Sequence, residues 1–106
     1  MEKIRVVIVP PKANAYVAEI DNTLESMQKL VDGYIELYSP FNHLGILPGI
    51  IVVCNEEGVL SNLPRNRLGI RGQFICLSDE IVGDGDFKGL SRVKARQLIS
   101  ILNGGE

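Results

Sequence analysis

The sequence is poor in the residues that build metal centres. It has one histidine, His43, and two cysteines, Cys54 and Cys76. A zinc site of the usual kind needs several Cys or His ligands at short spacing, so none is expected here. Each cysteine lies inside an apolar run, where a free thiol behaves as a small hydrophobe. We therefore expect both cysteines to be buried and reduced, and we expect no metal and no cofactor.

The sequence also lacks a surplus of positive charge and a long apolar run. Its 11 Lys and Arg are outnumbered by 13 Asp and Glu, which gives a formal net charge of −2. Such a chain has no long-range positive field to attract nucleic acid. No apolar run approaches the roughly 18 residues of a membrane span, and the chain opens on a strand pattern rather than a signal-peptide core. We expect a cytoplasmic protein that binds neither membrane nor nucleic acid.

What is present is typical of one small folded domain. Hydrophobic residues make up 45% of the 106-residue chain and charged residues 23%, close to the averages for globular proteins. A chain of this length buries about two thirds of its unfolded surface, which is enough for one core. No repeat, low-complexity tract or flexible linker interrupts it. The sequence predicts a single domain over residues 1–106.

Apolar and β-branched stretches predict the strands. They cover residues 4–9, 15–20, 34–38, 50–54, 59–63 and 73–77. The first two are expected to form a hairpin. The turn Asn55-Glu56-Glu57-Gly58 predicts a second antiparallel hairpin, which would join 50–54 to 59–63.

Two segments show helical spacing of apolar residues. The first covers 23–32, with Asn22 as its N-cap and Gly33 as its left-handed stop. The second begins after the cap Ser91 and runs to about Leu102. Loops are expected at 39–49 and 64–72, and a turn at 83–86. The sequence thus predicts the α+β class, with a mostly antiparallel sheet of five to six strands packed by two helices.

Two pairs of motifs resemble a known family. EIDNTLE (19–25) precedes LVDGYIE (30–36), and VCNEEG (53–58) precedes LPRNR (63–67). These motifs resemble the domain of unknown function 3846, over about residues 4–75 and more weakly beyond residue 80. The loop 41–49 is longer than the usual connection in that family. The resemblance implies a bacterial, phage or mobile-element accessory protein and implies no reaction.

An arginine-rich segment provides the candidate binding site. Three arginines lie within 64–72, and guanidinium groups grip phosphates or carboxylates with paired hydrogen bonds. Arg67 has an alternative role, an ion pair with Glu36 or Glu57, and Asn55 has an alternative role in its turn. Aromatic residues of 34–41 could supply a stacking surface. The predicted ligand-binding residues are Tyr34, Asn55, Glu57, Arg65, Asn66, Arg67 and Arg71.

No set of residues predicts catalysis. A nucleophile would need Cys54 or Cys76 together with His43 and a carboxylate such as Asp79 or Asp86, and no spacing singles out that set. Glu57 and Arg67 alone specify no oxyanion hole. The acidic residues of 80–86 lack the ligand spacing of a calcium loop. We therefore expect no catalytic residues.

Two functions are consistent with these features. The first is a non-enzymatic binding protein of a phage or mobile element that sequesters a nucleotide-like signalling molecule and so counters host defence. The alternative is a protein-interaction module that inhibits or modulates a host or phage enzyme through the apolar loop Leu44-Gly45-Ile46-Leu47. The strands 15–20 and 34–38 each carry one acidic residue and no lysine, so little in them opposes pairing with another chain. We therefore expect a homodimer that forms through one of these strands or through the apolar loop, with any ligand site close to the two-fold axis.

Overall fold

The computed structural model describes residues 2–41, 47–82 and 86–104 of the chain. The strands are β1 (Lys3–Val9), β2 (Tyr16–Asp21), β3 (Ile35–Tyr38), β4 (Ile50–Asn55), β5 (Phe74–Val82) and β6 (Asp86–Lys88). The helices are α1 (Leu24–Val31) and α3 (Arg92–Leu102), with the short 3-10 turn η1 (Arg67–Gly69). This content confirms the predicted α+β class.

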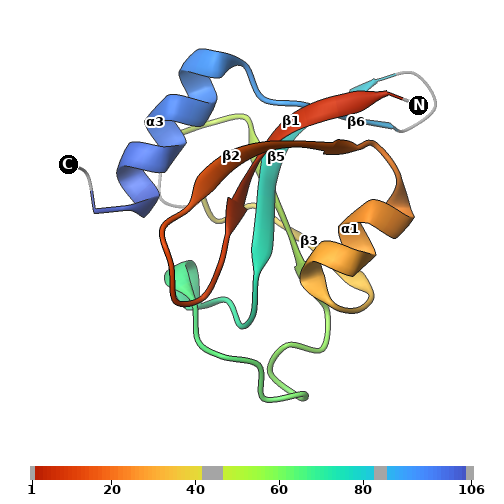
Figure 1. The fold of residues 1–106 in the computed structure, drawn as a ribbon, viewed down its shortest axis with the longest axis vertical. Helices are drawn as coiled ribbons and strands as arrows, with labels where there is room; N and C mark the ends of the chain where they lie inside the picture. Colours follow the sequence, from red (N-terminus) through yellow and green to blue (C-terminus); the bar gives the residue numbers. More distant parts are fainter. Residues whose placement is uncertain (1, 42–46, 83–85, 105–106) are drawn as a thin grey trace.

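The strands form one antiparallel sheet of six strands (Figure 1). Their order is β2-β1-β5-β4-β3, and the short β6 pairs with β5. The predicted hairpin of β1 and β2 is confirmed, with Ile4 opposite Ile20. The strands β2 and β3 lie at the two ends of this order, where the sequence placed its weakly guarded edges. Among the described residues, no strand pairs with the outer side of either, so both edges can accept a further strand.

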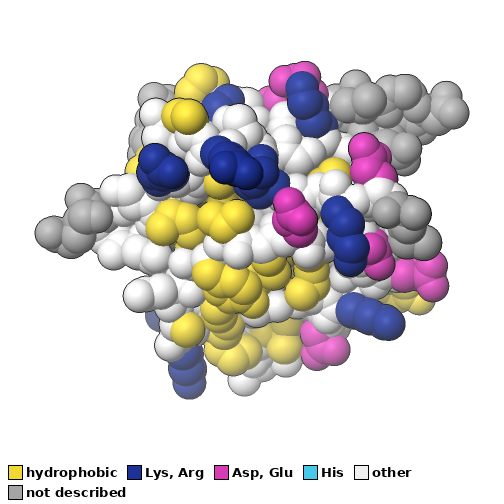
Figure 2. Space-filling model, turned by 45° about the horizontal axis from the view of Figure 1, so that its top comes forward, with side chains coloured by type: hydrophobic (Ala, Val, Ile, Leu, Met, Phe, Trp, Pro, Cys, Tyr) yellow, Lys and Arg dark blue, Asp and Glu magenta, His cyan; other side chains and the backbone are white. Residues whose placement is uncertain are grey.

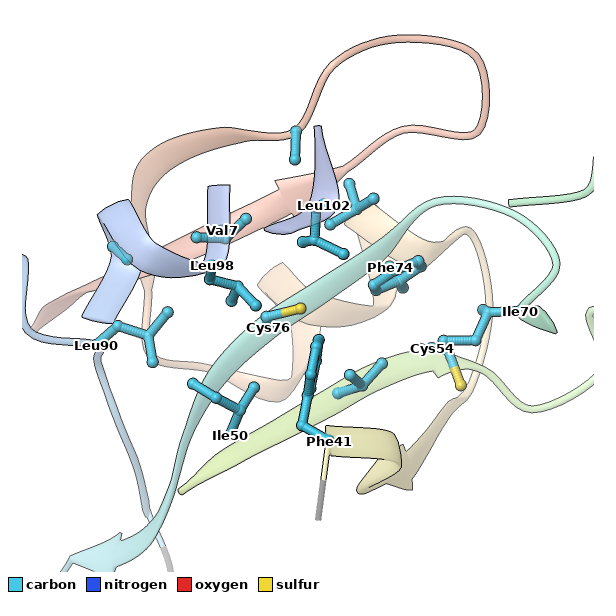
Figure 3. Packing of buried hydrophobic residues seen from close by; sticks show 14 residues of the cluster. Val7, Phe41, Ile50, Cys54, Ile70, Phe74, Cys76, Leu90, Leu98 and Leu102 are labelled. Atoms are coloured by element: carbon cyan, nitrogen blue, oxygen red, sulfur yellow. The ribbon is translucent and has the colours of Figure 1, made fainter. Parts of the chain in front are cut away.

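Both faces of the sheet are buried, and one helix packs on each. Side chains that alternate along a strand point to opposite faces. On one face, α3 packs through Ala95, Leu98 and Leu102 against a cluster that includes Val7, Val52, Phe74 and Cys76 (Figure 3). On the other, α1 packs through Met27 and Val31 against Val6, Ile8, Val53 and Ile75. Burial on both faces explains why β1, β4 and β5 read as continuous apolar runs.

Helix α1 begins and ends one residue away from the predicted caps. Thr23, and not Asn22, is the N-cap, and its Oγ1 accepts a hydrogen bond from the Ser26 N–H at 3.1 Å. The Asn22 amide instead donates to the Phe87 carbonyl at 2.8 Å. At the other end, Asp32 adopts the left-handed conformation with φ 62°. Gly33 is required for a different reason, because an added Cβ would lie 2.6 Å from the Asn55 Nδ2.

The predicted strand 59–63 is wrong. The segment forms successive turns, closed by hydrogen bonds from Ser61 N to Glu57 O and from Leu63 N to Gly58 O. The physical reason is that both sides of β4 are already paired, so this segment has no free edge of β4 to join, and Val59 and Leu60 stay 72% and 85% exposed. β4 pairs instead with β3 and β5.

The last strand is longer than predicted. β5 continues to Val82, and β6 returns from Asp86 where a turn over 83–86 was expected. Residues 83–85 lie outside the described part of the chain.

Candidate functional site

Residues 62–72, here called the arginine loop, cross one end of the sheet and are fixed there by Asn66. The Asn66 amide Nδ2 donates to the carbonyls of Val9 at 2.9 Å and Gly72 at 2.8 Å. Its Oδ1 accepts from the Arg67 N–H at 2.7 Å and so caps η1. One side chain thereby joins the end of β1 to the middle of the loop and to its last residue, Gly72.

Arg67 anchors the same loop to distant parts of the chain. Its Nε donates to the Leu102 carbonyl at 2.8 Å, its Nη1 to Pro10 at 3.0 Å and its Nη2 to Ala13 at 2.8 Å. The predicted ion pair of Arg67 with Glu36 or Glu57 is wrong, because carbonyl groups take these donors. A positive charge at the carbonyl end of α3 also interacts favourably with the helix dipole.

The anchored loop holds its backbone in an unusual conformation at Leu68 and Gly69. Their φ angles are 64° and 74°. The left-handed region costs a residue with a Cβ about 1–2 kcal/mol. Leu68 keeps it because its side chain packs against the core, and because the Ile70 N–H donates to Arg67 O at 3.2 Å. The loop is therefore a rigid platform.

Two hollows flank this platform. The first, here called the β3 hollow, has a volume of about 240 Å³ and lies between the β3–β4 edge and the loop. Its lining includes Glu36, Tyr38, Cys54, Glu56, Val59 and Arg71. The second, here called the arginine hollow, has a volume of about 250 Å³ and is lined by Arg65, Asn66, Gly69, Ile70 and Arg71.

The two hollows share three lining residues. Gly69, Ile70 and Arg71 line both of them. A Cβ added to Gly69 would have no atom within 4 Å, so the space above this glycine is open.

Arg65 and Arg71 point to the same side of the loop. An isolated antiparallel bridge pairs the two residues, and directly paired residues place their side chains on one face. The Arg71 Nη1 lies 3.4 Å from Asn62 Oδ1 and 3.3 Å from Leu63 O, which are long hydrogen bonds. Within the described residues, the Arg65 guanidinium has no hydrogen bond or ion pair. Two neighbouring positive charges thus face the arginine hollow with few partners.

The search for related proteins gave one match. A family model described as a domain of unknown function, DUF3846, matches residues 4–102. The chain belongs to the DUF3846 family. The match extends through α3, further along the chain than the motifs at residues 4–75. No curated protein and no solved structure matched the chain.

The motif residues of this DUF3846 domain hold its fold together. Asn66 and Arg67 fix the arginine loop, as described above. The Asn55 Nδ2 donates to the carbonyls of Val31 and Asp32, both at 3.0 Å, and so satisfies the end of α1. Its Oδ1 accepts from the Glu57 N–H at 2.7 Å. The amide and guanidinium groups of these three predicted ligand-binding residues are thus largely committed to the protein itself.

The remaining predicted residues divide between the hollows and the open surface. Arg65 and Arg71 line the hollows. Tyr34 is 68% exposed, and neither Tyr34 nor Glu57 lines either hollow. Tyr38 lines the β3 hollow in place of Tyr34, and it lies opposite Val52, whose side chain belongs to the α3 face of the sheet.

Sequence reasoning also missed the acidic side of the site. Glu36 and Glu56 line the β3 hollow, and Gly69 joins the two hollows. The signal for Glu36 was present, because residues 36 and 38 alternate with the apolar Ile35 and Leu37. No comparable signal marked Glu56, which depends on how the turn after β4 folds.

The cysteines of the DUF3846 domain are free and buried, as expected. Burial raises the pKa of the Cys54 thiol from 9.0 to about 11, and the negative charge of Glu36 adds to the effect. Burial raises the pKa of Cys76 further still. The thiolate form that a nucleophile needs is therefore disfavoured at both positions.

Other expectations fall partly outside the described residues. His43 and most of the apolar loop, Leu44 to Ile46, lie there, whereas Leu47 packs against the core. In the described part of the chain, no cluster of three His, Cys, Asp or Glu side chains is placed to hold a metal ion. None of the described helices is long and apolar enough to cross a membrane.

Proposed function

We propose that this DUF3846 domain is a non-enzymatic binding protein that holds a small nucleotide-like anion across residues 69–71. One observation carries the proposal: Arg71 lines both hollows, and Gly69 between them has no side chain. The combined site has a basic end and an end that is acidic and aromatic. That polarity matches a molecule with a phosphate at one end and a hydrogen-bonding ring at the other.

The basic end takes the phosphate. Arg65 and Arg71 face the same side of the loop, and a phosphate bound between them relieves their mutual repulsion. The long hydrogen bonds of Arg71 to Asn62 and Leu63 are readily exchanged for shorter, charge-assisted ones. Asn66 and Arg67 act indirectly, because they hold the loop rigid and so reduce the ordering cost of binding.

The other end takes the ring or the sugar. Glu36 and Glu56 repel a phosphate, but their carboxylates accept hydrogen bonds from hydroxyl or amino groups. Tyr38 and Val59 supply apolar surface against which a base can pack. The acidic residues thereby set the direction in which the ligand lies.

The biological role that we propose is sequestration. A protein without a catalytic set that binds a signalling nucleotide lowers its free concentration, which counters a host defence pathway when the protein is encoded by a phage or mobile element. In this role the protein would act in the cytoplasm, where such signals act. The accessory context implied by the family resemblance supports this role.

We also propose that the protein acts as a homodimer joined at β3. Leu37 and Tyr38 on this edge strand are 48% and 42% exposed, and the nearby Glu36 is the only acidic residue of the strand. Strand pairing about a two-fold axis would satisfy the outer backbone groups of β3 in both copies. Because β3 forms a wall of the β3 hollow, the dimer places the two ligand sites near the axis.

Isothermal titration calorimetry against cyclic dinucleotides, cyclic mononucleotides and ADP-ribose-type nucleotides tests the proposal. We expect saturable binding of at least one member, with no change in the ligand when it is recovered and analysed by chromatography. Adenosine, which lacks the anion, is the matched control and should bind at least tenfold more weakly. Absence of heat with every nucleotide at high protein concentration would overturn the proposal, and conversion of the ligand would overturn its non-enzymatic part.

A further inference from the structure

A third hollow lies between α3 and the β1–β2 hairpin and shares no lining residue with the two hollows at the arginine loop. It has a volume of about 280 Å³. Its floor is apolar, made by Val17, Ala95 and Ile99, and its remaining lining residues are Arg5, Arg92 and Arg96. Figure 2 shows Lys and Arg side chains gathered beside a hydrophobic patch on this side of the molecule.

The three arginines come from two elements and converge on one place. Arg92 and Arg96 are one turn apart on α3, so their side chains are neighbours on the helix surface. Arg5 comes from β1, and its Nη1 donates to the Leu90 carbonyl at 3.0 Å, which holds the guanidinium beside the start of α3. Two arginines from a helix and one from a strand thus surround a single apolar floor.

The charges around this hollow are poorly balanced. Helix α3 contains no acidic residue, and its third cation, Lys94, donates to the Pro48 carbonyl. The nearest carboxylate by register is Glu19, opposite Arg5 in the β1–β2 pair. The ion pairs found within the described residues are Lys3 with Asp21 and Lys88 with Glu80, so none involves these arginines. Like charges one turn apart on a helix repel, and an anion between them removes that repulsion.

We propose that this hollow binds a small amphipathic anion, a phosphate or carboxylate carried on a short acyl chain or an aromatic ring. The anionic group lies between Arg92 and Arg96, and the apolar part covers Val17 and Ile99. Val17 is 46% exposed, so an apolar ligand removes hydrophobic surface from water there. Ligand pockets usually measure about 300–1,000 Å³, so a volume just below this range selects a small ligand.

The chemistry of the hollow distinguishes this ligand from the alternatives. Inorganic phosphate would satisfy the arginines and leave the floor exposed. A neutral apolar molecule would cover the floor and leave the arginines unbalanced. A ligand with an anionic group and an apolar part binds both the arginines and the floor. Its affinity should therefore exceed that of inorganic phosphate and that of a neutral apolar molecule.

Calorimetric titration with octyl phosphate below its micelle concentration tests the proposal. We expect one molecule bound per chain, at least tenfold more tightly than inorganic phosphate or octanol. Equal affinity for inorganic phosphate would overturn the proposal. So would binding that occurs only with vesicles containing anionic lipid, because that result identifies a membrane surface and not a small-ligand site.

Substitutions in the lining test whether octyl phosphate binds in this hollow. Replacing both arginines, Arg92→Ala with Arg96→Ala, should weaken octyl phosphate binding at least tenfold, and Val17→Asp should weaken it similarly by placing a carboxylate on the floor. The matched control is Lys12→Ala, which removes an exposed positive charge that lines none of the three hollows and should leave octyl phosphate binding unchanged. Loss of binding in the control, or its persistence in the double variant, would overturn the assignment. Nucleotide binding at the arginine loop is measured in separate titrations, so a negative result for one proposed site can be distinguished from a negative result for the other.

Discussion

The Arg67 guanidinium is hydrogen-bonded to the carbonyl of Leu102, the last residue of α3, at 2.8 Å. The contact joins residues that are 35 positions apart, and the same side chain also binds the carbonyls of Pro10 and Ala13. Arg67 thus connects the arginine loop, the β1–β2 turn and the end of α3.

Replacing this side chain should destabilise the fold. We expect Arg67→Ala to lower the free energy of unfolding by about 2–4 kcal/mol, because it leaves several partly buried carbonyls without donors. Urea denaturation followed by circular dichroism measures the effect. Arg65→Ala is the matched control and should change stability by less than about 0.5 kcal/mol, since its guanidinium has no hydrogen bond within the described residues. Equal effects of the two substitutions would contradict the anchoring role.

The contact between Gly33 and Asn55 gives a second prediction, in the form of a double-mutant cycle. Asn55→Ala should cost about 1–2 kcal/mol, because the carbonyls of Val31 and Asp32 lose their donor. Gly33→Ala should also destabilise the protein, because its Cβ would lie 2.6 Å from Asn55 Nδ2. Once Asn55 is shortened, the clash disappears. The double variant should therefore be more stable than the sum of the single effects predicts, and strict additivity would contradict the contact.

The buried cysteines predict how stability depends on pH. Burial, together with the charge of Glu36, raises the pKa of Cys54 from 9.0 to about 11, and burial also raises the pKa of Cys76. Between those values the unfolded chain loses thiol protons that the folded protein keeps, so alkali favours unfolding. The stabilisation is complete below pH 9.0 and falls towards pH 11, by up to about 1.4 kcal/mol per pH unit for each thiol.

Comparison with Cys54→Ala and Cys76→Ala isolates this effect from the titration of tyrosines and lysines. Each variant should lose less stability than the wild type between pH 9 and 10.5, as measured by urea denaturation at each pH. Parallel stability curves for the wild type and both variants would contradict the raised pKa values.

The proposed dimer gives a fourth prediction. Multi-angle light scattering at micromolar concentration should give twice the 11.7 kDa mass of the chain. Leu37→Lys places a charge on the outer strand and should yield the monomer mass with the circular dichroism spectrum unchanged. Val17→Lys on the opposite edge strand, β2, is the matched control and should remain dimeric. A monomer mass for the wild type would remove the basis for the dimer.

The sequence was most informative where burial and periodicity agree. The strands β1, β4 and β5 could be predicted because both of their faces are buried, which makes their residues apolar throughout. The two edges were predictable because β2 and β3 are the strands with the mixed, partly exposed pattern. The strand prediction for 59–63 failed because Val59 and Leu60 are apolar and yet exposed. Composition alone does not show whether an apolar residue in a turn is buried.

The site was harder to predict because arginines and asparagines serve either a ligand or the backbone. Arg65, Arg67 and Arg71 look equivalent in the sequence. The structure separates them through contacts with residues far along the chain, such as Leu102 and Pro10, that no local pattern encodes. The three arginines around the α3 hollow were missed for the same reason, because Arg5 and Arg96 meet only in the folded protein.

The most direct test of the central claim compares nucleotide binding by Arg71→Ala and Arg96→Ala, each titrated with the tightest ligand of the wild type. Charge-assisted hydrogen bonds are worth about 1.5–3 kcal/mol, so loss of Arg71 should weaken binding at least tenfold. Arg96 is the matched control from the α3 hollow, and its loss should leave the affinity within about twofold. Unchanged affinity in Arg71→Ala, or an equal loss in Arg96→Ala, would contradict a nucleotide site at the arginine loop.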